Sequence, residues 1–387
     1  MLVIALPLHF YLESIFFYTQ ILYRENTFVA SVNFFGESLR FCGTFAIINT
    51  NSRQSEVSCM KKHPLLTAAA AAGTAVLGAA YGIYRVAFYQ KPTIAVPSPA
   101  DMPTREVYRK AMCPDADALA RDTFTPVHIT AQDGTPLAAR YYHHNDGAPL
   151  AIIFHGYRGY AVRDGLGGYT LCTKLGYNVL LPDQRAHGYS GGHTITMGVK
   201  ERYDARDWAV WARSHFGPEV PIFLMGVSMG AATVLLAAGL NLPGNVCGIV
   251  ADCGYTSPRE ITRKCLPEYL PGFPLGPTYA IGRLGAILFG HFDPEDADCT
   301  DAAAHSKVPI FFVHGDADGF VPYEMGRRNY EVCRAKGKRF LTVHGAEHAV
   351  SYYHDNTAYT KECTDFLQDC LTRRHFAWPK EAPDDAQ

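Results

Sequence analysis

A pentapeptide, Gly-Val-Ser-Met-Gly at residues 226–230, restricts the fold of this chain more than any other feature. The apolar segment 221–225 before it is typical of a buried strand, and the alanine- and leucine-rich segment 231–238 after it is typical of a helix. A sharp turn at this junction needs glycines, because larger side chains would collide with the strand and the helix. The pattern therefore predicts that Ser228 stands at the tip of the turn as a nucleophile. The alternative is an ordinary serine in a strand–helix turn.

A nucleophilic serine needs a general base, and the base needs an acid that orients it. Two further predicted strands end in polar loops, of which one carries Asp316 and Asp318 and the other His344 and His348. Parallel α/β sheets place their sites at these strand ends. We expect Asp318 and His348 to be the acid and the base, because the other two residues follow their strands too closely. Asp252, at the end of an earlier strand, is a further candidate for the acid.

The oxyanion that forms during attack on a carbonyl needs backbone N–H donors. The N–H of Met229, at the start of the helix after Ser228, is one candidate. A predicted strand at 149–154 is followed by His-Gly-Tyr-Arg-Gly at 155–159, and the N–H of Tyr157 can face that of Met229. The alternative is a glycine-rich turn with no catalytic duty.

These motifs together resemble the α/β-hydrolase superfamily and, more narrowly, bacterial membrane-anchored α/β-fold esterases of unassigned substrate. The resemblance runs from about residue 124 to residue 372. It rests on the segments 155–157, 183–190, 226–230, 314–318 and 345–348. It implies a triad of Ser228, Asp318 and His348, with Tyr157 and Met229 as oxyanion donors. Segment 183–190, Asp-Gln-Arg-Ala-His-Gly-Tyr-Ser, shapes a loop beside the site in this superfamily and receives no chemical step.

The order of predicted elements agrees with this fold. Residues 127–142 read as two strands around an Asp-Gly turn, which indicates a hairpin. Strands and helices then alternate, as a mostly parallel, doubly wound α/β sheet requires. The alternation lapses at about 255–307, where prolines punctuate an apolar stretch. We expect a small helical cap there whose apolar face lines the acyl pocket; the alternative is a surface excursion with a core-packing helix.

The segment before the catalytic domain has its own pattern. Residues 64–84 carry no charge, follow two lysines, and are long enough to span a bilayer as a helix. We therefore expect a signal anchor within 60–90; a cleaved signal peptide is the alternative. A buried domain helix is not expected, because no amphipathic pattern appears. Residues 91–123 then form a linker and lead-in segment, and 373–387 a polar tail.

The first 59 residues resemble neither a domain nor a targeting signal. Met60-Lys61-Lys62 has the form of an initiator with its own positive region, so we expect 1–59 to be an upstream-start extension without fold. Lysines on the inner side would leave the catalytic domain outside the cytoplasm, at the cell membrane or secreted after cleavage.

Composition excludes several functions. With 35 Lys and Arg against 37 Asp and Glu, the chain has a net charge of −2 and no basic footprint for nucleic acid. Eleven scattered cysteines contain no CxxC pair, so we expect no disulfide scaffold and no metal site. Cys253 is expected to be a small buried residue, because it lacks a placed base. The glycine-rich segment 165–168 lacks the strand-to-helix context of a dinucleotide site, so no cofactor is expected.

The sequence thus predicts a serine hydrolase that cleaves small-molecule carboxylic esters or thioesters through an acyl-enzyme. A peptidase or amidase of the acylaminoacyl kind is one alternative. The other is an inactive hydrolase fold that binds a lipid or peptide.

Overall fold

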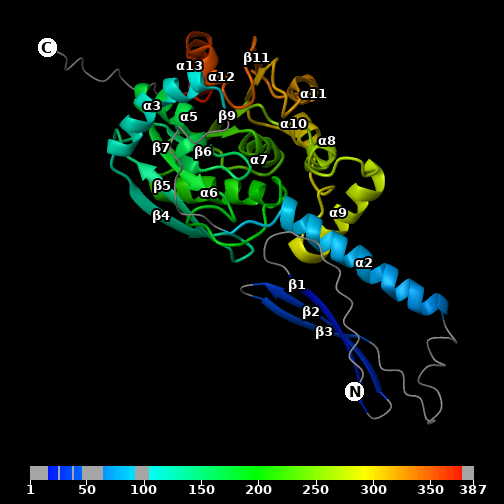
Figure 1. Ribbon diagram of the computed structural model, residues 1–387. Coiled ribbons are helices and arrows are strands. Elements are labelled where there is room, and N and C mark those ends of the chain that lie inside the picture. Colours follow the sequence, from blue (N-terminus) through cyan, green and yellow to red (C-terminus); the bar gives the residue numbers. More distant parts are fainter. Residues whose placement is uncertain (1–15, 25–26, 37–38, 46–63, 92–103, 377–387) are drawn as a thin grey trace. The chain divides into compact units, whose positions relative to one another are not determined.

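The computed structural model describes residues 16–24, 27–36, 39–45, 64–91 and 104–376, in two units that divide between Thr74 and Ala75 (Figure 1). The first unit contains an antiparallel sheet in the order β1 (Phe16–Arg24), β2 (Thr27–Gly36), β3 (Leu39–Phe45). We expected residues 1–59 to carry no fold, whereas residues 16–45 contain these three strands. Their sequences are rich in aromatic and β-branched residues, which favour strands. The proposed start at Met60 lies outside the described residues and stays a prediction.

The second unit is built around an eight-stranded sheet in the order β11-β10-β9-β8-β6-β7-β5-β4. Its strands are β4 (Thr125–Thr130), β5 (Pro136–Tyr142), β6 (Leu150–Phe154), β7 (Asn178–Asp183), β8 (Ile222–Val227), β9 (Val246–Asp252), β10 (Ile310–Gly315) and β11 (Arg339–Val343). Neighbours from β11 to β7 are parallel, and β5 and β4 add an antiparallel hairpin at the edge. The predicted mostly parallel, doubly wound sheet is therefore confirmed.

Helices cover both faces of the sheet, which explains why its central strands are apolar throughout. In β8, Leu224 packs into one core and Phe223 into the other, since successive side chains point to opposite faces. The first core includes α6 (Glu201–Phe216), α7 (Met229–Ala238), α10 (Cys299–His305) and α11 (Tyr323–Val332). The second includes α3 (Glu106–Arg121), α4 (Ala161–Asp164), α5 (Leu166–Lys174), α12 (Ser351–His354) and α13 (Asn356–Arg373).

The predicted cap region contains two helices of its own, α8 (Pro258–Tyr269) and α9 (Leu275–Gly290), between β9 and α10. The Ser257 hydroxyl caps α8 by accepting the N–H of Glu260 at 3.1 Å, and Pro258 occupies its first turn. Helix α10 follows and contributes Cys299 and Ala303 to the first core, which also includes Ile261 of α8 and Ala286 of α9. We use the word cap for α8, α9 and the turn between them, although one side of each helix packs against the main domain.

The uncharged N-terminal segment forms helix α2 (Pro64–Ala87). Within the part of the chain that the structure describes, no helix combines the length and hydropathy needed to cross a membrane. The prediction of a membrane-spanning helix over 64–84 therefore receives no support. The C-terminal part of α2 instead packs in the second unit, where Ala80 and Tyr84 are buried. The expectation against a buried domain helix is wrong for this part, because small residues allow close packing that leaves no amphipathic stripe.

Candidate active site

Ser228 stands at the junction between β8 and α7, with φ 57° and ψ −116°. This conformation is strained for a residue with a side chain, and it points Ser228 away from both elements. The flanking glycines make the turn possible. A Cβ added at Gly226 would overlap the carbonyl of Gly230, and one added at Gly230 would overlap the carbonyl of Phe154. A larger residue at either position would thus collide with the backbone, as predicted from the sequence.

His348 connects Ser228 to Asp318. Its Nε2 lies 2.9 Å from the Ser228 hydroxyl, and its Nδ1 lies 2.7 Å from Asp318 Oδ2. If Nδ1 carries the proton donated to the carboxylate, Nε2 is free to accept the serine proton. The three residues follow β8, β10 and β11, so the ends of three strands assemble the group. The structure brings together the three predicted residues, while their catalytic role stays a prediction.

The Asp318 carboxylate is held in a saturated, buried site. Its Oδ1 accepts the backbone N–H groups of Phe320 and Val321 at 2.9 and 2.8 Å, and its side chain is 0% exposed. His314 Nε2 lies 3.4 Å from Oδ2, the same oxygen that His348 Nδ1 contacts. Burial raises the pKa of Asp318, but the interactions with His314, His348 and the N–H of Val321 outweigh it and hold the pKa well below its usual range. The carboxylate therefore stays ionised opposite His348.

The other candidate residues have separate partners. His344 Nδ1 lies 2.8 Å from Asp316 Oδ2, and the same carboxylate accepts the N–H of Gly345 at 2.6 Å. Asp252 Oδ1 accepts the hydroxyl of Ser351 at 2.9 Å, and burial raises the pKa of this carboxyl to about 6. His344 is thus held by local hydrogen bonds, as expected, and neither alternative acid orients His348.

The predicted oxyanion loop, residues 155–159, lies directly beside Ser228. A Cβ added at Gly156 would lie 3.5 Å from Ser228 Cβ. The N–H of Gly156 donates to Asp164 Oδ2 at 3.0 Å, and the N–H of Gly159 donates to the carbonyl of Gly156 at 3.0 Å. Met229 is the first residue of α7, so its N–H has no partner within the helix. The loop and the first residue of α7 therefore both adjoin Ser228, and the role of Tyr157 and Met229 as oxyanion donors stays a prediction.

Comparison with known proteins identifies the family. Residues 152–291 match the family model described as alpha/beta hydrolase fold. The Bacillus subtilis protein YqkD is 30% identical over 227 residues, which cover 58% of this chain and 73% of that protein. The chain belongs to the α/β-hydrolase fold family. The lysophosphatidylserine lipase ABHD12 of Danio rerio is 22% identical over 244 residues, and the chain spans only 59% of its length. The Pyrococcus furiosus esterase Pf2001 has a similar fold, with a TM-score of 0.54, 22% identity and coverage of 72% of this chain and 99% of that one.

A buried polar network ties the two sides of this α/β-hydrolase site together, and sequence reasoning missed it. The Gln184 amide donates to the carbonyl of His155 at 2.5 Å and accepts the Thr233 hydroxyl of α7 at 3.0 Å. The rings of His155 and His187 meet with centroids 4.6 Å apart. Burial lowers their pKa values to about 4 and about 3, so both rings are neutral near pH 7. Segment 183–190 thus braces the oxyanion loop against the nucleophile helix.

Arg185 adds a second brace from the same segment. Its guanidinium donates to both carboxylate oxygens of Asp204, at 2.7 and 2.6 Å, and to Asp133 at 2.8 Å. Such a bidentate pair holds both partners in one geometry. The expectation that this segment shapes a loop beside the site agrees with these contacts. The sequence signal that could have indicated these contacts was the mixture of polar residue types directly after a buried strand.

The cap of this hydrolase adjoins the histidine side of the site. Lys264 of α8 donates to the carbonyl of Gly319 at 3.0 Å, and its ammonium lies 5.3 Å from the ring centroid of Phe320. The Phe320 ring in turn lies 5.0 Å from that of His348. A shift of α8 would therefore change the packing of Phe320 against His348.

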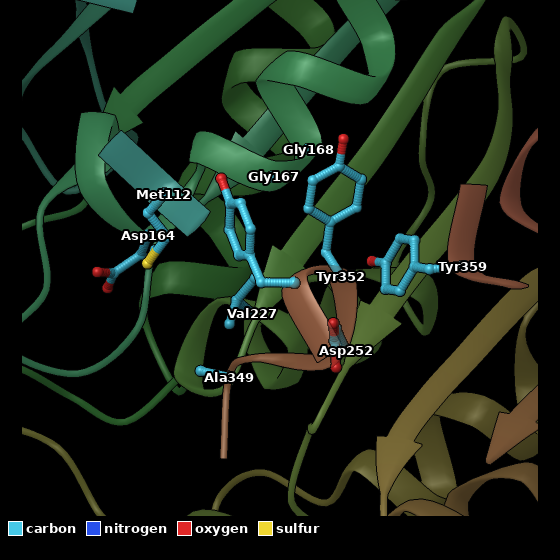
Figure 2. Close-up of a pocket in the computed structure, with 10 residues that line it drawn as sticks. Met112, Asp164, Gly167, Gly168, Val227, Asp252, Ala349, Tyr352 and Tyr359 are labelled. Carbon is cyan, nitrogen blue, oxygen red and sulfur yellow. The ribbon is translucent and has the colours of Figure 1, made fainter. Parts of the chain in front are cut away.

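A small cavity of about 50 Å³ lies beside the turn that carries Ser228 (Figure 2). Val227 and Ala349, the neighbours of Ser228 and His348 in the chain, form part of its wall. The remaining wall includes Met112 of α3, Asp164 of α4 and Tyr352 of α12. No residue of α8 or α9 lines this cavity, so it does not support the expectation that the cap lines the acyl pocket. Helix α3, which lies in the segment predicted to be a linker and lead-in, contributes Met112 to the cavity wall instead.

One group of side chains has the composition of a metal site. Ligand atoms of Cys253, Asp318 and His348 lie within 4.8 Å of one another. Burial raises the pKa of the Cys253 thiol well above its usual range, which disfavours the thiolate that metals bind. Asp318 and His348 are already paired. The group is therefore better explained as a triad packed against a buried cysteine, as expected for Cys253.

Proposed function

We propose that this α/β-hydrolase is a serine hydrolase that cleaves carboxylic esters or thioesters through an acyl-enzyme intermediate. The observation that carries the proposal is the position of His348, within hydrogen-bonding distance of both Ser228 and Asp318. A serine hydroxyl is a weak nucleophile until a neighbouring base removes its proton, and the base needs a fixed tautomer.

In the proposed reaction, Ser228 Oγ attacks the ester carbonyl carbon while His348 Nε2 takes its proton. The negative charge moves to the carbonyl oxygen, which accepts the backbone N–H groups of Tyr157 and Met229. The intermediate then collapses, the bond to the leaving group breaks, and His348 returns the proton to the departing alcohol or thiol. Water repeats these steps on the acyl-enzyme. Asp318 stays ionised throughout and stabilises the imidazolium.

Two alternatives compete with this function. A peptidase or amidase would need the same residues but must protonate a poorer leaving group. An inactive fold that binds a lipid or peptide would not need Ser228, Asp318 and His348 to be hydrogen-bonded to one another. Relatives named as an esterase and a lysophosphatidylserine lipase favour ester cleavage over both.

Two assays separate these functions. A fluorophosphonate probe should label the wild-type chain and not Ser228→Ala, because it reacts with an activated serine; no labelling of the wild type would favour the binding protein. p-Nitrophenyl esters and acyl thioesters should be hydrolysed, and aminoacyl anilides should not. Lysophosphatidylserine belongs in the same panel because of the Danio rerio relative. Preferred cleavage of the anilides would make the protein a peptidase.

The location of the protein is a further proposal. Two lysines precede the uncharged segment 64–84, and positive residues tend to remain on the cytoplasmic side. This rule applies only where the segment enters a membrane, and on that premise we propose that the catalytic domain lies outside the cytoplasm. Protease added to intact cells should degrade it, and protection until the cells are lysed would contradict this.

A further inference from the structure

Side chains of the predicted oxyanion loop, residues 155–159, form hydrogen bonds with the C-terminal end of helix α2. The Tyr157 hydroxyl donates to the carbonyl of Ala87 at 2.8 Å. The Arg158 guanidinium donates to the carbonyl of Val86 at 2.6 Å and to that of Tyr89 at 3.3 Å. Two adjacent side chains of the loop thus bind the last two carbonyls of α2 and one carbonyl just beyond its end, about seventy residues earlier in the sequence.

These contacts have a clear physical basis. The last carbonyls of a helix have no partner within it, and they carry the negative end of the helix dipole. A guanidinium is therefore a favourable partner for them. Burial raises the pKa of Tyr157 to about 12, so its hydroxyl remains a donor at any physiological pH. Arg158 has a positive φ of 51°, which is strained for a residue with a side chain and is stabilised here by its contacts.

The end of α2 is itself fixed from another direction. Phe88 is 2% exposed and packs edge-on against Phe292, with centroids 5.2 Å apart. The hydroxyls of Tyr84 and Thr194 lie 2.8 Å apart, and the N–H of Ile195 donates to the carbonyl of Phe88 at 2.8 Å. The carbonyls that the oxyanion loop binds therefore belong to a rigid support.

The part of α2 from Ala75 onward also packs closely against α9 of the cap (Figure 1). A Cβ added at Gly285 of α9 would overlap the carbonyl of Ala80, so only glycine permits this approach. The rings of Tyr81 and Phe289 meet edge to face with centroids 5.1 Å apart. The same helix therefore contacts the cap along one side and the oxyanion loop at its end.

We propose that the C-terminal end of α2 is a positioning element of the active site, which holds the oxyanion loop against Ser228 through the side chains of Tyr157 and Arg158. The inference rests on the proposed function, because it assigns the Tyr157 N–H to the oxyanion. Tyr157 thus has two roles in the proposal. Its backbone N–H donates to the oxyanion, and its side-chain hydroxyl donates to the end of α2. The contacts also argue that α2 is retained in the active protein rather than removed as a signal peptide.

The proposal predicts a loss in kcat with little change in KM. The oxyanion is present in the tetrahedral intermediate and the transition states that flank it but not in the bound substrate, so a misplaced N–H weakens transition-state binding and leaves substrate binding nearly unchanged. A displacement of about 1 Å can cost about a hundredfold. We expect Tyr157→Phe and Arg158→Ala to lower kcat about tenfold each in the full chain, the double variant to lose more, and Arg158→Lys to recover part of the loss.

Matched controls remove similar groups elsewhere. Tyr323→Phe removes a hydroxyl that lies 2.7 Å from the Thr342 hydroxyl, and Arg327→Ala removes a guanidinium paired with Glu331 on the same helix. Both should keep kcat within twofold. Thermal unfolding should show that the single variants are folded, and Tyr157→Phe, which keeps the ring, provides the test if Arg158→Ala is not.

Two readouts keep this proposal separate from the proposed function. Hydrogen exchange should show faster exchange of the amides of residues 155–159 in the Tyr157 and Arg158 variants than in the controls, whether or not an ester is hydrolysed. An active wild type with unchanged kcat and unchanged exchange in both variants would overturn the positioning role alone. A rise in KM at constant kcat would overturn it too, because the side chains would then bind substrate. Equal ester hydrolysis by the wild type and Ser228→Ala would instead overturn the proposed function.

Discussion

Replacement of Asp318 by asparagine tests the triad most sharply. Asparagine keeps the shape and one oxygen, which can still accept the N–H groups of Phe320 and Val321 now bound by Oδ1. Its NH2 group then faces His348 Nδ1, where the carboxylate lies 2.7 Å away. An NH2 group cannot accept the Nδ1 proton, so the ring takes the tautomer with its proton on Nε2 and can no longer accept the proton of Ser228.

The expected loss follows from this change of tautomer. Removal of the orienting carboxylate in such a triad lowers kcat about 10⁴-fold. At about 1.4 kcal/mol per factor of ten, the loss corresponds to about 5 kcal/mol of transition-state stabilisation. KM should change little, because Asp318 is buried and does not reach the substrate.

The assay is steady-state hydrolysis of a p-nitrophenyl ester at pH 7.5, with thermal unfolding as a check that the variants are folded. Asp316→Asn is the matched control, because this residue lies in the same loop and bonds to the exposed His344 instead. It should keep kcat within a few-fold. A loss below tenfold in Asp318→Asn, or a severe loss in Asp316→Asn or Asp252→Asn, would refute the assignment of the acid.

Three further predictions concern the base, the acyl chain and stability. Ser228→Ala and His348→Ala should each lower kcat by several orders of magnitude and the double variant little more, because the two act as a unit; His344→Ala should remain active, and the reverse ranking would move the base. For p-nitrophenyl esters from C2 to C12, kcat/KM should rise up to butyrate or hexanoate, by about 0.8 kcal/mol of transition-state stabilisation per methylene, and then fall, because the cavity beside the Ser228 turn is only about 50 Å³; a rise continuing to laurate, or a flat profile, would contradict this. Burial lowers the pKa of His187 to about 3 from 6.5, so its neutral ring stabilises the fold above pH 6.5, and this contribution is lost as the pH falls toward 3. In urea unfolding, the wild type should therefore lose about 1.4 kcal/mol per pH unit relative to His187→Gln between pH 6 and 4, and parallel pH profiles would contradict the argument.

Much of the catalytic arrangement was readable from the sequence, because it depends on local pattern and chain order. A sharp turn requires glycine two residues before and two residues after Ser228, and a buried strand followed by a helix is recognisable from composition. Parallel strands place the loops after them at one edge of a sheet, so the order serine, acid, histidine was enough to predict that the three loops meet. The choice of Asp318 over Asp316 also followed from distance along the loop.

Contacts between distant segments were decided only by the tertiary structure. The apolar run that includes Tyr84 reads as a membrane span, because composition records hydrophobicity and not what covers it; in the fold, Gly285 lets a neighbouring helix approach and bury its end. Tyr157 and Arg158 form hydrogen bonds with residues about seventy positions earlier in the chain, and no local sequence pattern encodes such a contact. The sequence by itself therefore determined which backbone turns present the reactive groups. Tertiary packing decided what holds those turns in place, because side-chain partners depend on which surfaces the folded chain brings together.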